Sequence, residues 1–285
     1  MKFADVKNDV AFHKIFGNEN RTDVLVSFLN SILAFEGDQR IVSITILNPY
    51  QLPKLTGGKT SIVDMRATDQ VGRQYIIEMQ VAPKAGFDKR VLYYTSRGYT
   101  DQIERGDFYQ KLKPAIFVGI LDFVQTTNPH YISRSQVQDI ETGEQTIKDI
   151  EFNFIELPKF KKEEHELSNL AEKWIYFIKN SEHLAFIPDN LNDEGLKKAY
   201  QEANQRTWSK AEMSAYDYIF MKEEDGRAEL EYATNIGTMK GKAEGKAEGE
   251  RIAKINIAIK MKQKEVVIED IIEITGLSEE EIKNL

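Results

Sequence analysis

Two carboxylates on a predicted β-hairpin are the residues in this chain best suited to chemistry. Residues 60–82 read as two strand-like arms, TSIVDMRATD and RQYIIEMQVA, separated by the loop QVG. A three-residue loop that ends in glycine suits a type I turn closed by a residue in the left-handed region. The register that follows places Asp64 opposite Glu78, with Gln80 on the same face of the hairpin.

The pattern D-x13-E-x-Q predicts a site for a divalent cation. Two carboxylates on one face repel each other unless a cation lies between them. Carboxylate oxygens are hard ligands that suit Mg²⁺ or Mn²⁺. We therefore expect Asp64 and Glu78 to be metal ligands, with Gln80 beside them. A polar, solvated face of an antiparallel sheet accounts equally well for this spacing.

A basic, aromatic segment follows the hairpin. Residues 84–113 carry 7 basic and 4 acidic residues, with tyrosine and phenylalanine interleaved. We expect four of its positive side chains to contact DNA phosphates, and these are Lys84, Lys89, Arg90 and Arg97. The alternative is an amphipathic helix that packs its apolar stripe on the sheet and leaves its charges solvated.

The elements that must position these residues change character near residue 160. Before it, helices are expected at 9–16, 22–35 and 87–105, and strands at 41–47, 60–82, 114–123 and 149–157. On the hairpin, Ile62, Arg66 and Ile76 are expected to join the carboxylates, and the other face is expected to be apolar, with Val63, Met65, Ala67, Tyr75, Ile77, Met79 and Val81. Beyond residue 160 nearly everything reads as helix.

These patterns predict three segments. Residues 1–160 form an α/β core, residues 161–234 a helical extension packed on it, and residues 235–285 a helical stalk with a small terminal helical pair. Within the last segment, glycine recurs every four residues from 237 to 249, which suits either a flexible linker or a helix with a small-residue stripe. The final 21 residues carry seven acidic residues and one lysine, so we expect them to bind a protein surface, not DNA.

Composition excludes several classes of protein. The 285 residues include no cysteine, which excludes disulfides and thiolate metal sites. No apolar run approaches the length of a membrane span, and the first residues lack the centre of a signal peptide, so we expect a cytoplasmic protein without a membrane partner. The stretch LTGGKTS lacks the first glycine of a P-loop, so no nucleotide cofactor is expected. The net charge of −8 leaves only local surfaces for nucleic acid.

Three stretches in this order resemble a known family. They are NDVAFHKIFG, SIVDMRATDQVGRQYIIEMQ and RVLYYTSRGYTDQIERGDFYQKLKPAIFVGILDF. Together they resemble the PD-(D/E)XK nuclease superfamily, in particular its recombination-promoting nuclease, or transposase-like, branch. The resemblance covers about residues 5–230. It implies a restriction-endonuclease-like core, a mixed central sheet flanked by helices, with an α-helical C-terminal extension.

The resemblance also implies roles for individual residues. Asp64 matches the metal-ligand aspartate, and Glu78 matches the glutamate of the E-x-K motif. Gln80 stands where most of the superfamily has lysine, and glutamine can orient water or phosphate but cannot supply positive charge. Asp9 corresponds to a further acidic ligand in many relatives, although an aspartate there is equally suited to capping a helix. Lysine at position 80 is expected to be tolerated.

Two functions follow from these features. The first is a Mg²⁺- or Mn²⁺-dependent DNA endonuclease that promotes recombination or acts in mobile-element or defence biology. The second is a nuclease-fold protein with little or no cleavage activity that serves as a dimeric assembly or DNA-binding module. Gln80 favours the second, and the Asp64/Glu78 pair favours the first. In either case DNA is the expected partner, and the C-terminal helices are expected to mediate a homodimer.

Overall fold

The computed structural model describes residues 1–48, 50–51, 61–188 and 191–285. Most of the LTGGKTS stretch, residues 55–60, lies outside the described residues. The chain divides into two compact units, Met1–Phe220 and Met221–Leu285. The glycine-spaced stretch from 237 to 249 is helical, which confirms the helix alternative over the flexible linker.

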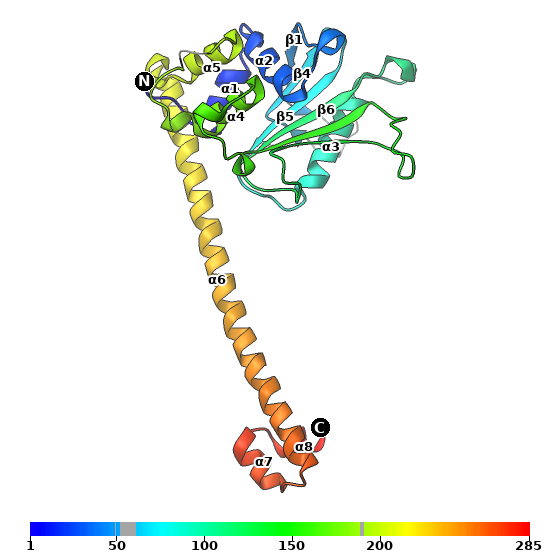
Figure 1. The fold of residues 1–285 in the computed structure, drawn as a ribbon, viewed down its shortest axis with the longest axis vertical. Coiled ribbons are helices and arrows are strands. Elements are labelled where there is room, and N and C mark those ends of the chain that lie inside the picture. Colours follow the sequence, from blue (N-terminus) through cyan, green and yellow to red (C-terminus); the bar gives the residue numbers. More distant parts are fainter. Residues whose placement is uncertain (49, 52–60, 189–190) are drawn as a thin grey trace. The chain divides into compact units, whose positions relative to one another are not determined.

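The first unit is built on a six-stranded mixed sheet with the order β1-β4-β5-β6-β8-β7 (Figure 1). Its strands β5, β6 and β8 are parallel, and the other neighbouring pairs are antiparallel. The strands are β1 Ile44–Leu47, β4 Met65–Asp69, β5 Gln74–Gln80, β6 Ala115–Leu121, β7 Ile132–Gln136 and β8 Ile150–Glu156. A separate two-stranded sheet pairs β2 Tyr50–Gln51 with β3 Ser61–Ile62.

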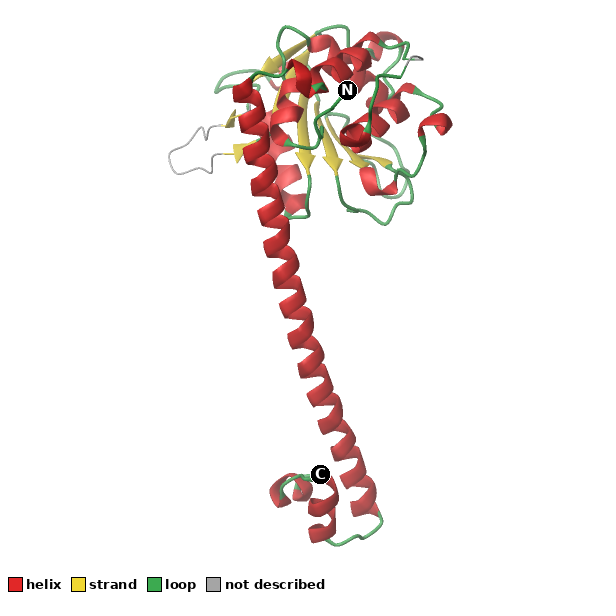
Figure 2. Cartoon of the chain, turned by 90° about the vertical axis from the view of Figure 1, so that its left-hand side faces the viewer, coloured by secondary structure: helices red, strands yellow, loops and turns green. Residues whose placement is uncertain are grey.

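Helices cover both faces of the sheet (Figures 1 and 2). One face packs against the helices α1 Asp9–Phe16, α2 Thr22–Leu33, α4 Leu170–Asn180 and α5 Glu194–Ala203. The other face carries α3 Phe87–Thr100, whose Phe87 and Val91 bury against Ile76 and Phe117. Short 3₁₀ turns lie at Gly37–Gln39, Tyr109–Lys111, Leu157–Lys159, Glu164–Glu166, Ser181–His183 and Gln205–Thr207. The predicted restriction-endonuclease-like α/β fold is confirmed.

The predicted hairpin register is confirmed as well. Met65 pairs with Ile77 and Thr68 with Gln74, so the same alignment carried one position further at each end places Asp64 across from Glu78 and Asp69 across from Arg73. Gly72 has φ +90°, the left-handed conformation that the turn requires. The amide of Gly72 donates to the carbonyl of Asp69 at 3.0 Å and closes the turn.

Two residues of the predicted hairpin faces differ from the prediction or cannot be compared with it. Val63 packs with Ile76 and α3, not with Met65, because β4 begins only at Met65 and the chain bends at Asp64. The side chain of Ile62 lies outside the described residues. The alternative of a solvated polar face is wrong: α3 covers it, and Glu78 and Gln80 are only 4% and 6% exposed.

Some predicted boundaries also shift. Helix α3 ends at Thr100, five residues before the predicted end, and the strand predicted at 41–47 begins at Ile44. Strand β7 was not predicted, because ISRSQ lacks a sustained apolar alternation. Asn8 is the N-cap of α1, since its side chain accepts from the amide of Val10, and Asp9 is therefore the first helical residue.

The second unit contains most of α6 Lys210–Gln263, an uninterrupted helix (Figure 2), together with α7 Ile268–Thr275 and α8 Glu279–Lys283. Ala258 near the end of α6 packs with Ile271, Leu277 and Ile282. The terminal helical pair therefore packs its apolar side chains partly against α6 of the same chain. Among the described residues, no helix is both long and apolar enough to cross a bilayer.

Candidate active site

The carboxylates of the hairpin meet at the carboxyl end of β5. Strand β5 is central, and its side chains alternate, so Ile76, Glu78 and Gln80 all face α3. The opposite face of β5 places Tyr75, Ile77 and Met79 in the main core. Packing on both faces therefore fixes the two polar side chains of β5 under a helix, not in solvent.

Asp64 is held beside Glu78 by the backbone of β5. The ladder between β4 and β5 ends at Met65 and Ile77. Beyond these residues a side-chain hydrogen bond replaces the backbone ladder: Asp64 Oδ2 accepts from the amide of Met79 at 2.7 Å. The bend at Asp64 thus turns a carboxylate toward the strand that carries Glu78.

The environment of both carboxyls disfavours their charged forms. Burial, and next the neighbouring charge of Asp64, raise the pKa of Glu78. Burial is also the main reason why the pKa of Asp64 is raised, and the negative charge of Asp9 adds to it. A divalent cation stabilises the charged forms of such a pair.

Arg90 of α3 brings a positive charge to the same site. Its Nη2 lies 3.2 Å from Glu78 Oε2 and 2.5 Å from Gln80 Oε1. The guanidinium also lies over the rings of Phe87 and Tyr94, each with its centroid 5.7 Å away. Arg90 therefore bridges the two motif side chains of β5 from the helix that covers them.

The predicted DNA-binding residues divide into two groups. Lys84, shortly before α3, and Lys89, in its first turn, are exposed, and the charge of Lys84 lowers the pKa of both site carboxyls. Arg90 instead belongs to the carboxylate site, and Arg97 pairs with Asp101 at 3.5 Å. The position of Arg90 in the site was missed from the sequence. The sequence pattern that could have indicated it is the spacing of Arg90 and Tyr94, one helical turn apart. Both lie beside the buried stripe of Phe87, Val91 and Thr95.

Asp9 lies near enough to act electrostatically on Asp64 but is itself exposed. Among the described residues, no group of three or more His, Cys, Asp or Glu side chains is placed to hold a metal ion together. The structure thus brings together Asp64, Glu78, Gln80 and Arg90, with Asp9 and Lys84 in the electrostatic surroundings.

A sequence comparison decides the family. A family model described as PD-(D/E)XK nuclease family transposase matches residues 6–233. The chain belongs to the PD-(D/E)XK nuclease family. Members of this family are nucleases, so a nuclease-type function follows, a hydrolase acting on nucleic acid, and the family generally uses divalent metal ions. No curated protein and no solved structure shows significant similarity to this PD-(D/E)XK protein.

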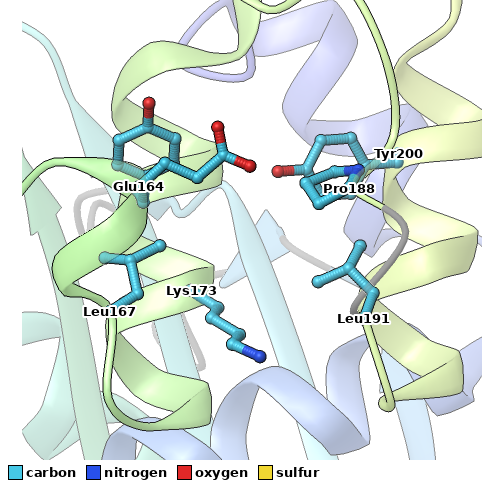
Figure 3. Close-up of a pocket in the computed structure, with 7 residues that line it drawn as sticks. Glu164, Leu167, Lys173, Pro188, Leu191 and Tyr200 are labelled. Atoms are coloured by element: carbon cyan, nitrogen blue, oxygen red, sulfur yellow. The ribbon is translucent and has the colours of Figure 1, made fainter.

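A separate pocket of the PD-(D/E)XK core lies away from the carboxylates. It has a volume of about 60 Å³ and is lined by Glu164, Leu167, Lys173, Tyr176, Pro188, Leu191 and Tyr200 (Figure 3). Pockets for small-molecule ligands are typically about 300–1,000 Å³. None of its lining residues belongs to the candidate active site.

Proposed function

We propose that this protein is a divalent-metal-dependent DNA endonuclease. Its active site, which hydrolyses phosphodiester bonds, consists of Asp64, Glu78 and Gln80. Its biological setting in this proposal is recombination, mobile-element transfer or defence. The observation that carries the proposal is a pair of carboxyls at the end of β5, Glu78 buried and Asp64 half-buried, with their pKa values raised. A fold gains nothing from such a pair by itself, but a bound cation compensates the repulsion.

The donor set fits Mg²⁺ or Mn²⁺. Mg²⁺ is commonly bound by one or two protein carboxylates, several waters and the phosphates of the substrate. Asp64 and Glu78 supply that number of carboxylates, and Asp9 is the candidate for a further acidic group near the ion. When bound, the ion lowers the pKa of a water ligand and neutralises charge on the scissile phosphate.

Side chains around the carboxylates would orient water or phosphate and stabilise the charge that develops on the phosphate. Because Gln80 Oε1 accepts from Arg90, the amide nitrogen of Gln80 is the group left to donate to water or phosphate. The guanidinium of Arg90 supplies the positive charge that glutamine lacks at the third motif position, and it holds Glu78 in place. Charge developing on the phosphate would be stabilised by this fixed cation.

DNA would approach the site from the N-terminal end of α3. Lys84 and Lys89 are exposed there and are suited to phosphate contacts. Phe108 and Tyr109, in the loop after α3, are 73% and 80% exposed. Exposed aromatic rings beside cations are the usual surface for stacking on unpaired bases or packing on sugars. Arg97 would contribute only if its pairing with Asp101 were broken.

A second candidate function is that of an assembly or DNA-binding module without cleavage activity. The neutral Gln80 favours it, because many relatives rely on a motif lysine for charge. Arg90 weighs against it, since it places a cation within hydrogen-bonding distance of both Glu78 and Gln80. Metal binding at the carboxylates, followed by cleavage, separates the two functions.

The test of the metal site is a titration of the full chain with Mn²⁺, followed by calorimetry and by the electron paramagnetic resonance of the free ion. We expect saturable binding that is lost in Asp64→Asn and in Glu78→Gln. Asp88→Asn is the matched control, because Asp88 is an exposed carboxylate on α3. Equal binding by all four proteins would refute the metal site at these carboxylates.

A further inference from the structure

The long helix α6 presents an apolar stripe that the described part of the chain leaves exposed. Tyr232, Met239 and Met221 are 70%, 68% and 64% exposed, and Ile236 is 48% exposed. At 3.6 residues per turn, these four residues fall within about 80° of arc around the helix, together with Ala228 and Ala243. We call these six residues the α6 stripe.

The α6 helix needs a partner for thermodynamic reasons. Residues 231–254 are exposed along their whole length. Gly226, Gly237, Gly241, Gly245 and Gly249 lie within the helix, and each costs about 1 kcal/mol relative to alanine. Isolated helices are marginal in water even with good helix formers, and in proteins most of their stability comes from packing an apolar face. The α6 stripe is the face available for that packing.

The charges of α6 identify the partner. Residues 222–231 carry five acidic and two basic residues, whereas residues 240–254 carry five basic and three acidic residues. A parallel neighbour of the same sequence would place the acidic segment of one helix beside the acidic segment of the other. An antiparallel neighbour of the same sequence sets each acidic half against a basic half. We propose that α6 pairs antiparallel with α6 of a second copy of this chain, through the α6 stripe.

The apolar residues agree on one register. With the two-fold axis between Asn235 and Ile236, Tyr232 lies level with the partner's Met239, and Ala228 lies level with the partner's Ala243. Between Ala228 and Ala243, bulky side chains thus meet near the axis and the two alanines lie further out, while Met221 lies beyond this stretch. From Ala228 to Ala243 the stripe is about 22 Å long at 1.5 Å per residue.

The flanking charges agree with the same register. Glu229 and the partner's Lys240 lie on one side of the stripe, within about 3 Å along the axis. Glu231 and the partner's Lys242, and Glu224 and the partner's Lys246, lie on the other side at similar offsets. Each pair occurs twice in a symmetric dimer. Exposed ion pairs contribute only about 0.2–1 kcal/mol each, so the charges select the orientation and the apolar stripe supplies affinity.

Competing contacts within the chain are weak. Lys240 lies 3.8 Å from Glu244, and Lys246 lies 4.0 Å from Glu250, with all four side chains more than 60% exposed. The glycines from 237 to 245 lie at least about 130° around the helix from the centre of the α6 stripe, so the small-residue stripe that they form takes no part in this pairing.

Charge reversal in the full chain tests the pairing, with analytical ultracentrifugation as the readout. We expect the wild type to sediment at twice the chain mass of 32.8 kDa. Glu229→Lys/Glu231→Lys should shift it to the monomer mass, and so should Lys240→Glu/Lys242→Glu. The quadruple variant with both pairs reversed should regain the dimer, which excludes unfolding as the cause. A monomeric wild type, or double variants that remain dimeric, would overturn the proposal.

Disulfide trapping tests the orientation, because the chain has no cysteine of its own. Mixed Tyr232→Cys and Met239→Cys proteins should form a covalent heterodimer under mild oxidation. Neither variant alone should crosslink efficiently, since the two copies of either position lie about 10 Å apart along the axis. Efficient crosslinking of Tyr232→Cys with itself would show a parallel pair and contradict the inference.

Discussion

Arg90 on α3 donates to the carboxylate of Glu78 on β5 across 3.2 Å, and the same nitrogen bonds Gln80. The guanidinium is held by Phe87 and Tyr94, one residue from each neighbouring turn of α3. The helix that covers the motif strand therefore carries the positive charge that the strand itself lacks. This relationship makes α3 part of the proposed active site as well as part of the core.

The first prediction concerns Arg90→Ala. Removing a fixed donor that stabilises developing charge typically lowers kcat by roughly 10²–10³-fold. We expect a loss of that size in DNA cleavage, with little change in affinity for uncleaved DNA. Lys89→Ala is the matched control on the same helix, and we expect it to weaken DNA binding and leave kcat near the wild-type value. Equal effects of the two substitutions on kcat would contradict the role given to Arg90.

The second prediction concerns Gln80→Lys, and the structure reverses the expectation from the sequence. A lysine at position 80 would place an ammonium against the guanidinium of Arg90 at a buried position and remove its acceptor. We expect lower stability and lower cleavage. The double variant Gln80→Lys/Arg90→Gln moves the charge from helix to strand and should recover activity relative to either single variant. The comparison uses cleavage rates and thermal unfolding of all four proteins.

The third prediction is a pH dependence of stability without metal. Burial, and next the charge of Asp9, raise the pKa of Asp64 from 3.8 to about 6, and burial, with the charge of Asp64, raises that of Glu78 from 4.5 to about 8. Between the pKa values of the unfolded state, near 4, and that of Glu78 in the folded state, about 8, the folded state binds more protons than the unfolded state. The free energy of unfolding in EDTA should therefore fall as pH rises from about 4 to about 8. Urea unfolding across this range provides the measurement.

Glu78→Gln is the matched variant for that experiment. It cannot ionise, so the fall in stability with rising pH should be much shallower, and the variant should be more stable than the wild type at about pH 8 in EDTA. Adding Mg²⁺ should stabilise the wild type and not the variant. A variant that follows the wild-type pH profile would show that the slope arises from other groups.

The fourth prediction concerns the close approach of α3 to the sheet. A Cβ atom at Gly98 would lie 2.9 Å from Ile76 Cδ1. Gly98→Ala should destabilise the core by about 1–3 kcal/mol and lower cleavage, because the helix that carries Arg90 must move. Adding Ile76→Val removes the clashing atom and should restore part of both losses. Gly226→Ala, where a Cβ meets nothing within 4 Å, should be neutral or slightly stabilising.

The hairpin could be predicted in detail because its turn and its alternation agree. The QVG loop requires Gly72 in the left-handed region, and one glycine position then fixes the register from Asp69 to Asp64. The start of helix α5 has a local signal of the same kind, since the side chain of Asp193 accepts from the amide of Leu196 and caps the helix. Local signals of this kind need no knowledge of the rest of the fold.

The burial of the motif face could not be predicted in the same way. Glu78 and Gln80 are polar in the sequence, and only the packing of Phe87 and Val91 against Ile76 covers them. That contact depends on where α3 returns to the sheet, which no local pattern specifies. The place of Arg90 in the site, and the bend that turns Val63 toward α3, depend on the same tertiary contact.

Conversion of supercoiled plasmid to open-circular or linear DNA is the measurement that tests the central claim most directly. The wild-type chain should cleave plasmid with Mg²⁺ or Mn²⁺ and not in EDTA. Folded Asp64→Asn and Glu78→Gln should show no metal-dependent cleavage, whereas Asp88→Asn should cleave as the wild type does. Cleavage by Glu78→Gln at the wild-type rate, or a folded wild type that binds Mn²⁺ yet leaves the plasmid intact, would contradict the account.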